Sequence, residues 1–291
     1  MRSTPLVDWP IILDSGKPGP CLLIIGGIHG DEPCGINAIQ AIVQDPEAYR
    51  PTHGKMMLMY GNPQAIKKGV RYIDENLNRI FMKSKENLPD KLLCLEKQRM
   101  QQLKLYMDKA DILLDIHASY TQKSKPFVIC EPNAMQLVPF LPCDIVCFGF
   151  DSIQPGGTDW YMNSIGKIGI CVECGYLGAQ SSTAVAMNAC KSILGALEMS
   201  VNRGTRRKQE WYQATQQYCA RTDNFQLVRA YADFENIPKG TPFAKDGDQT
   251  LYATEGMYLL FARNTQEKGQ EAFLSLVRIT PPPPPPHTSP Y

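Results

Sequence analysis

Short apolar runs and longer stretches with helical spacing alternate along the chain from Cys21 to about Ser200. The runs are bounded by turn residues, which is typical of buried strands. Alternation of strands and helices indicates a three-layer α/β fold. Strands are expected at residues 21–25, 55–60, 111–119, 127–130, 145–150 and 168–174, and helices at 33–43, 92–107, 158–165 and 182–199.

The pattern changes after Asn202. Residues 203–222 are polar and charged, and we expect a solvated linker or a short helix. Residues 223–280 contain short β-type segments separated by turn signals, which predicts a small β-rich domain. Residues 281–291 begin with a proline run, which predicts an extended tail, with a binding site for an SH3-like partner as the alternative. Residues 1–202 then form the larger, first domain.

The strongest chemical signal follows the first apolar strand, where Gly26 and Gly27 break the run. His29 and Glu32 come next, just past the carboxyl end of the strand, where open α/β sheets place their sites. An imidazole and a carboxylate three residues apart can bind one cation, and zinc takes such nitrogen and oxygen ligands. Catalytic zinc sites use three protein ligands, so this pair predicts a third ligand elsewhere.

The search for the third ligand is short, because the chain has 4 histidines. His117 ends another apolar run in the pattern D-x-H, so a second strand end would deliver it to the site. His53 lies in a turn-like stretch and His287 in the proline-rich tail, which makes both poor ligands. His117 is therefore the better candidate.

A polar segment at residues 71–79, R-Y-I-D-E-N-L-N-R, supplies candidate substrate contacts. The planar guanidinium of Arg79 matches a carboxylate, and Asn78 adds a neutral donor. The fixed charge of Arg71 suits a carbonyl oxygen that becomes an oxyanion. Arginine and asparagine are common in loops, so the segment gains its meaning from the metal motif.

Glu173 lies near the end of the strand expected at residues 168–174. A carboxylate in an apolar strand is costly unless it has a partner or a task, and a metal-activated water needs a general base. Cys171 and Cys174 have C-x-x-C spacing, but residues three apart on a strand point to opposite faces. We therefore expect Cys171 beside the site rather than a redox or thiolate pair.

Composition narrows the partners. The formal net charge of +1 gives no reason to expect binding to nucleic acid or to a membrane surface. The first residues lack the apolar segment of a signal peptide, and no apolar run has the length of a membrane span. The 10 cysteines are scattered through apolar runs, which is typical of reduced thiols in the cytosol. We expect a cytoplasmic protein, and whether it forms a homo-oligomer stays open.

The motifs G-G-x-H-G-D-E, R-Y-x-D-x-N-L-N-R, D-x-H and V-E-x-G together resemble the succinylglutamate desuccinylase/aspartoacylase family of zinc carboxypeptidase-like enzymes. The resemblance runs from about Leu22 to Met199, and the β-rich end is similar to the small C-terminal domain of these proteins. It implies a three-layer zinc hydrolase domain with a mixed, mostly parallel sheet, and one zinc ion per chain.

The resemblance also implies a role for each matched position around the metal. The zinc ligands would be His29, Glu32 and His117. Glu173 would be the general base, and Asp115 would orient a ligand histidine.

On the substrate side, Arg71 would polarise the scissile carbonyl, and Asn78 with Arg79 would hold a substrate carboxylate. One position departs from the family, because a further substrate-binding arginine is missing and Asn163 lies roughly where it would be. The missing cation argues against a dicarboxylate such as N-acetylaspartate. It leaves Asp159 available for a substrate amine, with capping of a local helix as the alternative.

These features predict a zinc-dependent amidohydrolase that removes a small acyl group from an N-acyl amino acid or a related amine. Its partner would be a small N-acyl amino acid-like molecule. The alternatives are a zinc carboxypeptidase that acts on short peptides and a non-catalytic metal-binding protein of the same fold. The complete set of predicted ligands and base argues against the non-catalytic alternative.

Overall fold

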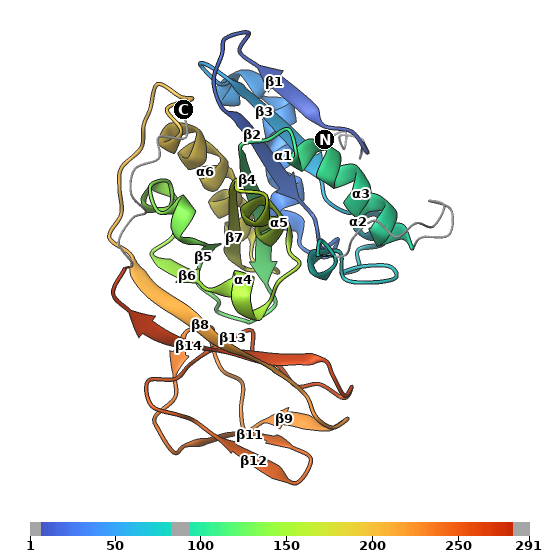
Figure 1. Ribbon diagram of the computed structural model, residues 1–291, viewed down its shortest axis with the longest axis vertical. Coiled ribbons are helices and arrows are strands. Elements are labelled where there is room, and N and C mark those ends of the chain that lie inside the picture. Colours follow the sequence, from blue (N-terminus) through green and yellow to red (C-terminus); the bar gives the residue numbers. More distant parts are fainter. Residues whose placement is uncertain (1–6, 83–93, 282–291) are drawn as a thin grey trace.

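One continuous sheet runs through most of the chain in the computed structural model, which describes residues 7–82 and 94–281 (Figure 1). Within these residues the sheet has 11 strands. From one edge to the other they are β1 (Ile11–Asp14), β3 (Lys55–Tyr60), β2 (Cys21–Gly26), β4 (Ile112–Ser119), β7 (Ile168–Tyr176), β5 (Phe127–Cys130), β6 (Ile145–Phe148), β8 (Glu210–Cys219), β14 (Glu271–Ile279), β13 (Tyr258–Leu260) and β10 (Glu235–Asn236). The strands from β8 onward belong to the C-terminal part of the chain.

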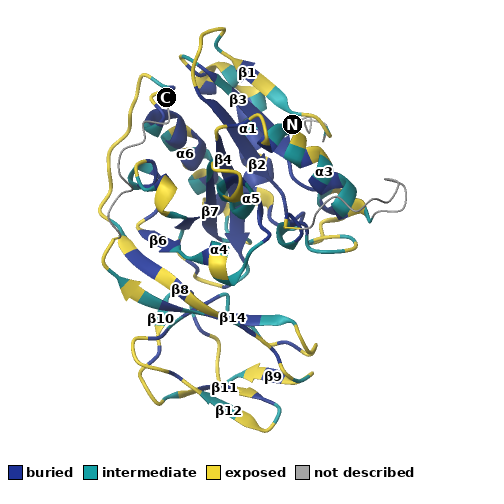
Figure 2. Ribbon diagram, viewed as in Figure 1, coloured by how far each residue is buried: buried dark blue, intermediate teal, exposed yellow. Residues whose placement is uncertain are grey.

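The centre of the sheet is parallel. β3, β2, β4 and β7 lie side by side and run in the same direction, so that Ile25 lies opposite Asp115 and Asp115 opposite Cys171. Nearly all of their residues are buried, as expected for parallel strands covered on both faces (Figure 2). The carboxyl ends of these strands therefore meet at one edge of the sheet. The predicted mixed, mostly parallel sheet is confirmed.

Helices cover both faces of the parallel centre and complete the three layers (Figure 1). One face packs against α1 (Pro33–Gln44) and α6 (Gln180–Ala196), and the other against α3 (Leu95–Met107) and α5 (Thr158–Ser164). Successive residues of a strand point to opposite faces, so each apolar run fills both cores. Each fully buried Leu, Ile or Val contributes about 1.5–3 kcal/mol, which makes these two layers the main source of stability.

Glycines allow α1 to lie directly against β2. A Cβ atom on Gly26 would lie 2.5 Å from the carbonyl carbon of Gly35, so the helix and strand can approach this closely only without side chains there. Pro33 occupies the first turn. The N-cap is Glu32, and its side chain makes no capping hydrogen bond. The carboxylate of Glu32 is instead directed into the site described below.

The sheet continues into the C-terminal domain through β8, which pairs in parallel with β6 and antiparallel with β14. The prediction of a linker or short helix over residues 203–222 is therefore wrong for residues 210–219. This strand is rich in polar residues because one of its faces is exposed, while side chains such as Trp211 and Tyr218 are buried. Its exposed polar residues give this stretch the composition of a solvated linker, although the other face of the strand is buried.

The remainder of the small β-rich domain is antiparallel. A second sheet has the order β12 (Gln249–Tyr252), β11 (Pro242–Asp246) and β9 (Phe225–Leu227). The proline run from residue 282 onward lies outside the described residues, as does the expected helix start at Leu92. The exact domain boundaries stay predictions. Among the helices of the described residues, none is long and apolar enough to cross a membrane.

Candidate active site

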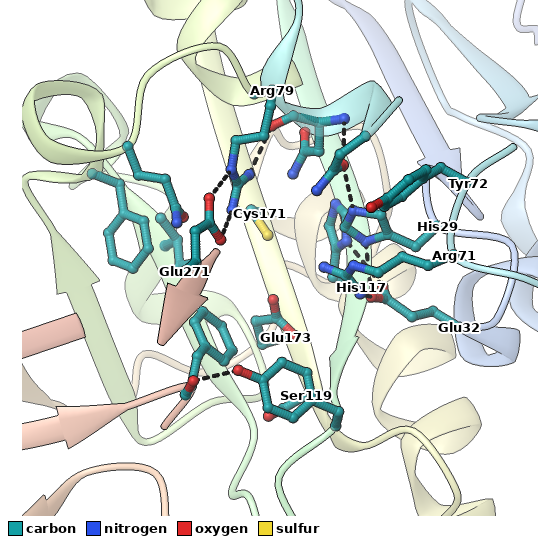
Figure 3. A pocket seen from close by; sticks show the side chains of 18 of the residues that line it. His29, Glu32, Arg71, Tyr72, Arg79, His117, Ser119, Cys171, Glu173 and Glu271 are labelled. Carbon is teal, nitrogen blue, oxygen red and sulfur yellow. Dashed lines mark hydrogen bonds and ion pairs between the residues drawn. The ribbon is translucent and has the colours of Figure 1, made fainter. Parts of the chain in front are cut away.

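Three strand ends bring the predicted metal and base residues to one edge of the sheet (Figure 3). His29 and Glu32 follow β2, His117 lies near the end of β4, and Glu173 lies near the end of β7. β4 and β7 pair in register, with His117 opposite Glu173. The register of parallel strands thus places a predicted ligand and the predicted base side by side.

His29, Glu32 and His117 form one buried group. Oε1 of Glu32 lies 2.8 Å from Nδ1 of His29, and Oε2 lies 2.9 Å from Nδ1 of His117. Ligand atoms of the three residues all lie within 4.8 Å of one another. Two imidazole nitrogens and one carboxylate oxygen are a donor set that zinc prefers, and they leave a position for water or substrate.

Neighbouring side chains fix the orientation of both imidazoles. Oδ2 of Asp115 lies 2.9 Å from Nε2 of His117, and the hydroxyl of Thr158 donates to the same oxygen. Oδ1 of Asn76 lies 3.1 Å from Nε2 of His29. In both rings Nδ1 is therefore the nitrogen left for a metal ion. The predicted contact between Asp115 and a ligand histidine is confirmed.

Burial and charge have opposing effects on this group. Burial lowers the pKa of His29. Burial acts in the same direction on His117, but Asp115 and Glu32 outweigh it and raise the pKa of His117 well above its usual value. Although burial alone would raise the pKa of Glu32, the two histidines hold it well below its usual range. The carboxylate of Glu32 therefore stays ionised although it is buried, and protons shared with the two histidines balance its charge. A bound cation would replace those protons.

Glu173 is a buried carboxylate with an unused oxygen. The residue is 7% exposed, and Oε2 has no hydrogen-bond partner among the described residues. Burial and the charge of Glu32 raise the pKa of Glu173 to about 8. A buried polar atom without a partner destabilises the fold, so such atoms usually have a functional reason. Proton transfer beside the His29–Glu32–His117 group, called the metal group below, is a function that fits this position.

Arg71 reaches the metal group from the loop after α2 (Pro63–Lys68). Its Nη1 donates a hydrogen bond to Oε1 of Glu32 at 2.9 Å. This contact holds a fixed positive charge beside the predicted metal ligands.

A cavity of about 650 Å³ is lined by the metal group and by the other predicted site residues. The predicted residues on its wall are His29, Glu32, Arg71, Asn78, Arg79, His117, Asp159 and Glu173. Cys171 also lines the cavity, whereas Cys174 belongs to the core on the opposite face of the sheet. The structure therefore brings all eight predicted residues around one space.

Arg79 and Asn78 already have partners within the protein. Arg79 donates to both carboxylate oxygens of Glu271, from Nε at 2.8 Å and from Nη2 at 3.1 Å (Figure 3). Oδ1 of Asn78 accepts a hydrogen bond from the backbone N–H of Thr158. Because Glu271 begins β14, the C-terminal domain itself supplies a carboxylate to the arginine predicted to bind the substrate.

The wall of the cavity near Asp159 is acidic. Asp151 lines the same wall, and burial together with the charge of Glu131 raises its pKa to about 7. Burial also raises the pKa of Asp159. Asn163, near the position of the missing family arginine, donates a hydrogen bond to Oδ2 of Asp151 at 3.1 Å. This region therefore carries acids where a dicarboxylate substrate would need a cation.

Sequence reasoning missed one side of the cavity. Residues 261–270, which connect β13 to β14, line it from the C-terminal domain, and Tyr120 lines it from the end of β4. Local turn signals mark this segment as a loop but do not connect it to the site. Asn76 was also missed, although it lies inside the polar segment of residues 71–79. Its Oδ1 lies 3.1 Å from Nε2 of His29.

Glu96 holds in place the loop that carries Arg71. Its carboxylate is fully buried and accepts hydrogen bonds from Nδ2 of Asn62 at 3.0 Å and from the backbone N–H groups of Ile73 at 2.7 Å and Asp74 at 3.1 Å. One side chain on α3 therefore binds both the residue before α2 and the loop after it.

Glu96→Ala is expected to lower the free energy of unfolding by about 2 kcal/mol, because one buried and two partly buried donors lose their acceptor. Urea unfolding followed by circular dichroism measures the change. Glu47→Ala is the control, since that carboxylate is exposed and pairs only at the surface, and its effect is expected to be much smaller than that of Glu96→Ala. Equal stability of the two variants would show that Glu96 does not hold the loop.

A buried His–Glu–His group at strand ends of an α/β sheet, beside a carboxylate with a free oxygen, is typical of metal-dependent hydrolases. The profile of the succinylglutamate desuccinylase/aspartoacylase catalytic domain matches residues 18–194, and that of the AstE/AspA barrel-sandwich hybrid domain matches residues 207–279. The chain belongs to the succinylglutamate desuccinylase/aspartoacylase family, which is a family of deacylases.

Relatives with assigned names are moderately similar. An N-acyl-aromatic-L-amino acid amidohydrolase (carboxylate-forming) of Rattus norvegicus is 32% identical over 180 residues, which are 55% of this chain and 54% of that protein. A probable aspartoacylase of Nostoc sp. is 27% identical over 52% of this chain and 54% of its own length. The match thus spans about half the length of these two relatives. A succinylglutamate desuccinylase of Idiomarina loihiensis is 24% identical over 87% of this chain and 81% of its own length.

Solved structures show the same fold at lower identity. The succinylglutamate desuccinylase of Vibrio cholerae superposes with a TM-score of 0.76 at 20% identity, covering 90% of this chain and 82% of that one. The ectoine utilization protein EutE (DoeB) of Ruegeria pomeroyi, solved with product bound, has a TM-score of 0.71 at 16% identity over 91% of this chain and 87% of that one. These structures confirm the architecture.

Proposed function

We propose that this protein is a zinc-dependent amidohydrolase that removes a small acyl group from an N-acyl amino acid or a related amine. The observation that carries the proposal is the buried, unpartnered Oε2 of Glu173 beside the His29–Glu32–His117 group in one cavity. Metal-dependent amide hydrolysis needs a metal site and a proton carrier next to each other, and this arrangement would supply both.

His29, Glu32 and His117 would hold one zinc ion per chain through Nδ1, a carboxylate oxygen and Nδ1, respectively. Bound there, zinc would polarise the acyl carbonyl and lower the pKa of a water molecule. Asp115 would keep the ring of His117 oriented through Nε2, as it does in the structure.

Glu173 and Arg71 would carry out the parts of the reaction that belong to the protein. Oε2 of Glu173 would accept a proton from the attacking water and pass it to the nitrogen of the leaving amine. The guanidinium of Arg71 would stabilise negative charge on the former carbonyl oxygen, since it already lies beside the metal group. Burial supports this role, because a proton carrier with a raised pKa can both take up and release a proton near neutral pH.

The second part of the proposal concerns the residues of the cavity wall that would contact the substrate. Asn78 and Arg79 remain predicted to border the carboxylate end of the substrate, and Asp159 the end with the side chain. Direct binding of a carboxylate by Arg79 would require displacement of Glu271. Residues of the loop 261–270 form part of the cavity wall, and a cavity of about 650 Å³ has room for a small N-acyl amino acid.

A hydrolysis screen of the zinc-loaded protein tests the proposal. N-acyl amino acids and short peptides would be compared by release of the free amine. Turnover of N-acyl amino acids with little cleavage of peptides supports the deacylase. Faster cleavage of peptides would identify a carboxypeptidase instead, and absence of all turnover in the zinc-loaded protein would favour a non-catalytic metal-binding protein.

Among N-acyl amino acids, we expect N-acetylasparagine and N-acetyl derivatives with basic side chains to be cleaved at least about 10-fold faster than N-acetylaspartate, judged by kcat/KM. A second substrate carboxylate would have to leave water next to Asp151 and Asp159, which costs several kcal/mol unless a cation pairs with it. Asparagine and aspartate have nearly the same shape, so this pair isolates the charge. A preference for N-acetylaspartate would contradict the charge argument.

A further inference from the structure

The cavity has a second source of positive charge in the C-terminal domain. Residues 261–270 lie between β13 and β14 and form part of the cavity wall. Arg263 and Lys268 of this segment line the cavity. The sequence motifs do not include either residue.

The arginines on the cavity wall differ in their partners. Arg71 donates to Glu32 at 2.9 Å. Arg79 is bound by both oxygens of Glu271. Arg263 has no carboxylate within salt-bridge distance among the described residues, although its charge helps to lower the pKa of Glu271. It is therefore the cavity arginine that forms no ion pair with a described residue.

Arg263 is held in a defined place although its charge is unpaired. Its Nε donates to the backbone carbonyl of Glu271 at 3.1 Å, and its guanidinium carbon lies 5.1 Å from the centre of the Tyr120 ring. The hydroxyl of Tyr120 donates in turn to the carbonyl of Phe261. Because one edge of the guanidinium is used in this way, the two Nη groups remain for a planar acceptor.

Tyr120 also connects Arg263 to the metal group. It follows directly on β4, the strand that carries His117, so the arginine of the C-terminal domain rests on the strand that delivers a metal ligand. Lys268 has no comparable support, since it is exposed on the loop and, among the described residues, its contact is a hydrogen bond from its backbone N–H to Oδ1 of Asp223. A fixed fork binds a carboxylate with less loss of conformational entropy than a free lysine.

We propose that Arg263 binds the free carboxylate of the substrate and that Arg79 stays paired with Glu271. Arg79 could take this role only by leaving the carboxylate of Glu271, which is about one third exposed, without its partner. Arg263 can accept a carboxylate without breaking any ion pair of the described residues. The inference rests on the proposed deacylase function and names the residue that selects its carboxylate-bearing substrates.

The test compares two substrates on the same variant, an N-acyl amino acid and its carboxamide, in which the free carboxylate is replaced by a neutral group. Arg263→Gln is expected to raise KM for the acid by about 10- to 100-fold, the effect of losing a charge-assisted bidentate contact. The kcat for the acid and the kinetics of the carboxamide should change less than about threefold. Because both substrates meet the same protein, a folding defect would affect both and cannot imitate this split.

Arg221→Gln is the matched control. Arg221 belongs to the same domain and also lies over a tyrosine ring, at 5.5 Å from that of Tyr218, but it does not line the cavity. Its kinetics with both substrates should match those of the unmodified protein. Arg79→Gln tests the competing assignment, in which Arg79 rather than Arg263 binds the substrate carboxylate.

Two outcomes separate this inference from the function on which it rests. If the unmodified protein cleaves the acid, and Arg263→Gln leaves the preference for acid over carboxamide unchanged or Arg79→Gln alone abolishes it, then Arg263 is not the receptor. If the unmodified zinc-loaded protein cleaves no N-acyl amino acid, the proposed function itself is wrong.

Discussion

Glu173→Gln is expected to reduce kcat by at least roughly 10²-fold, the lower end of what a positioned general base contributes. Glutamine has the same shape as glutamate but cannot accept the proton of the attacking water. The loss should appear in kcat, because the proposed proton transfer stabilises the transition state rather than the bound substrate. Initial rates at saturating substrate measure the effect.

Zinc content should remain near one ion per chain in this variant, since Glu173 is not among the three predicted ligands. Glu267→Gln is the control, because Glu267 also lines the cavity but lies exposed on the C-terminal loop. Turnover close to normal in Glu173→Gln would remove this residue from the mechanism. Loss of zinc together with activity would instead make it a metal ligand.

His117→Ala is expected to reduce zinc from about one ion per chain to a small fraction of that. The substitution removes one of the three ligands, and Glu32 and His29 alone cannot complete a tetrahedral site. Elemental analysis of the purified protein by mass spectrometry gives the zinc content directly. Hydrolysis should fall with it, since the metal is required for the proposed reaction.

His53→Ala is the matched control for zinc binding. His53 is a histidine of the first domain that lies in a turn away from the cavity, and its ring contacts the hydroxyl of Thr52. It should retain full zinc occupancy. Because His117→Ala also leaves the buried Asp115 without the histidine, circular dichroism must first show that the variant is folded. A folded variant with undiminished zinc would mean that the ligand assignment is wrong.

The residues of the metal group could be predicted from the sequence, because the spacing of His29 and Glu32 is local and the strands that deliver these residues are apolar. His29 and Glu32 lie three positions apart in the sequence, so their proximity does not depend on the rest of the fold. His117 and Glu173 are distant in sequence, but each ends an apolar run, and parallel strands bring their carboxyl ends to one edge. Hydrophobic pattern and strand-end chemistry were therefore sufficient to predict which residues meet.

The C-terminal domain was harder to interpret from sequence. β8 has one exposed face, so its polar residues dominate the composition and conceal the alternation that marks a strand. Its pairing with β6 and β14 makes one sheet of both domains, and this depends on partners that are distant in sequence. Propensity alone cannot decide such pairings, because strand stability comes mainly from neighbouring strands.

The sequence by itself determined the fold class, the family and the residues of the His29–Glu32–His117 group with Glu173, because these follow from periodicity and from motifs at strand ends. The tertiary structure decided the charges that a substrate would meet. Arg79 is paired with Glu271, 192 residues away, and Arg263 reaches the cavity from another domain. Contacts at such separations leave no trace in local spacing, because they arise only when the β-rich domain packs against the edge of the sheet that carries the site.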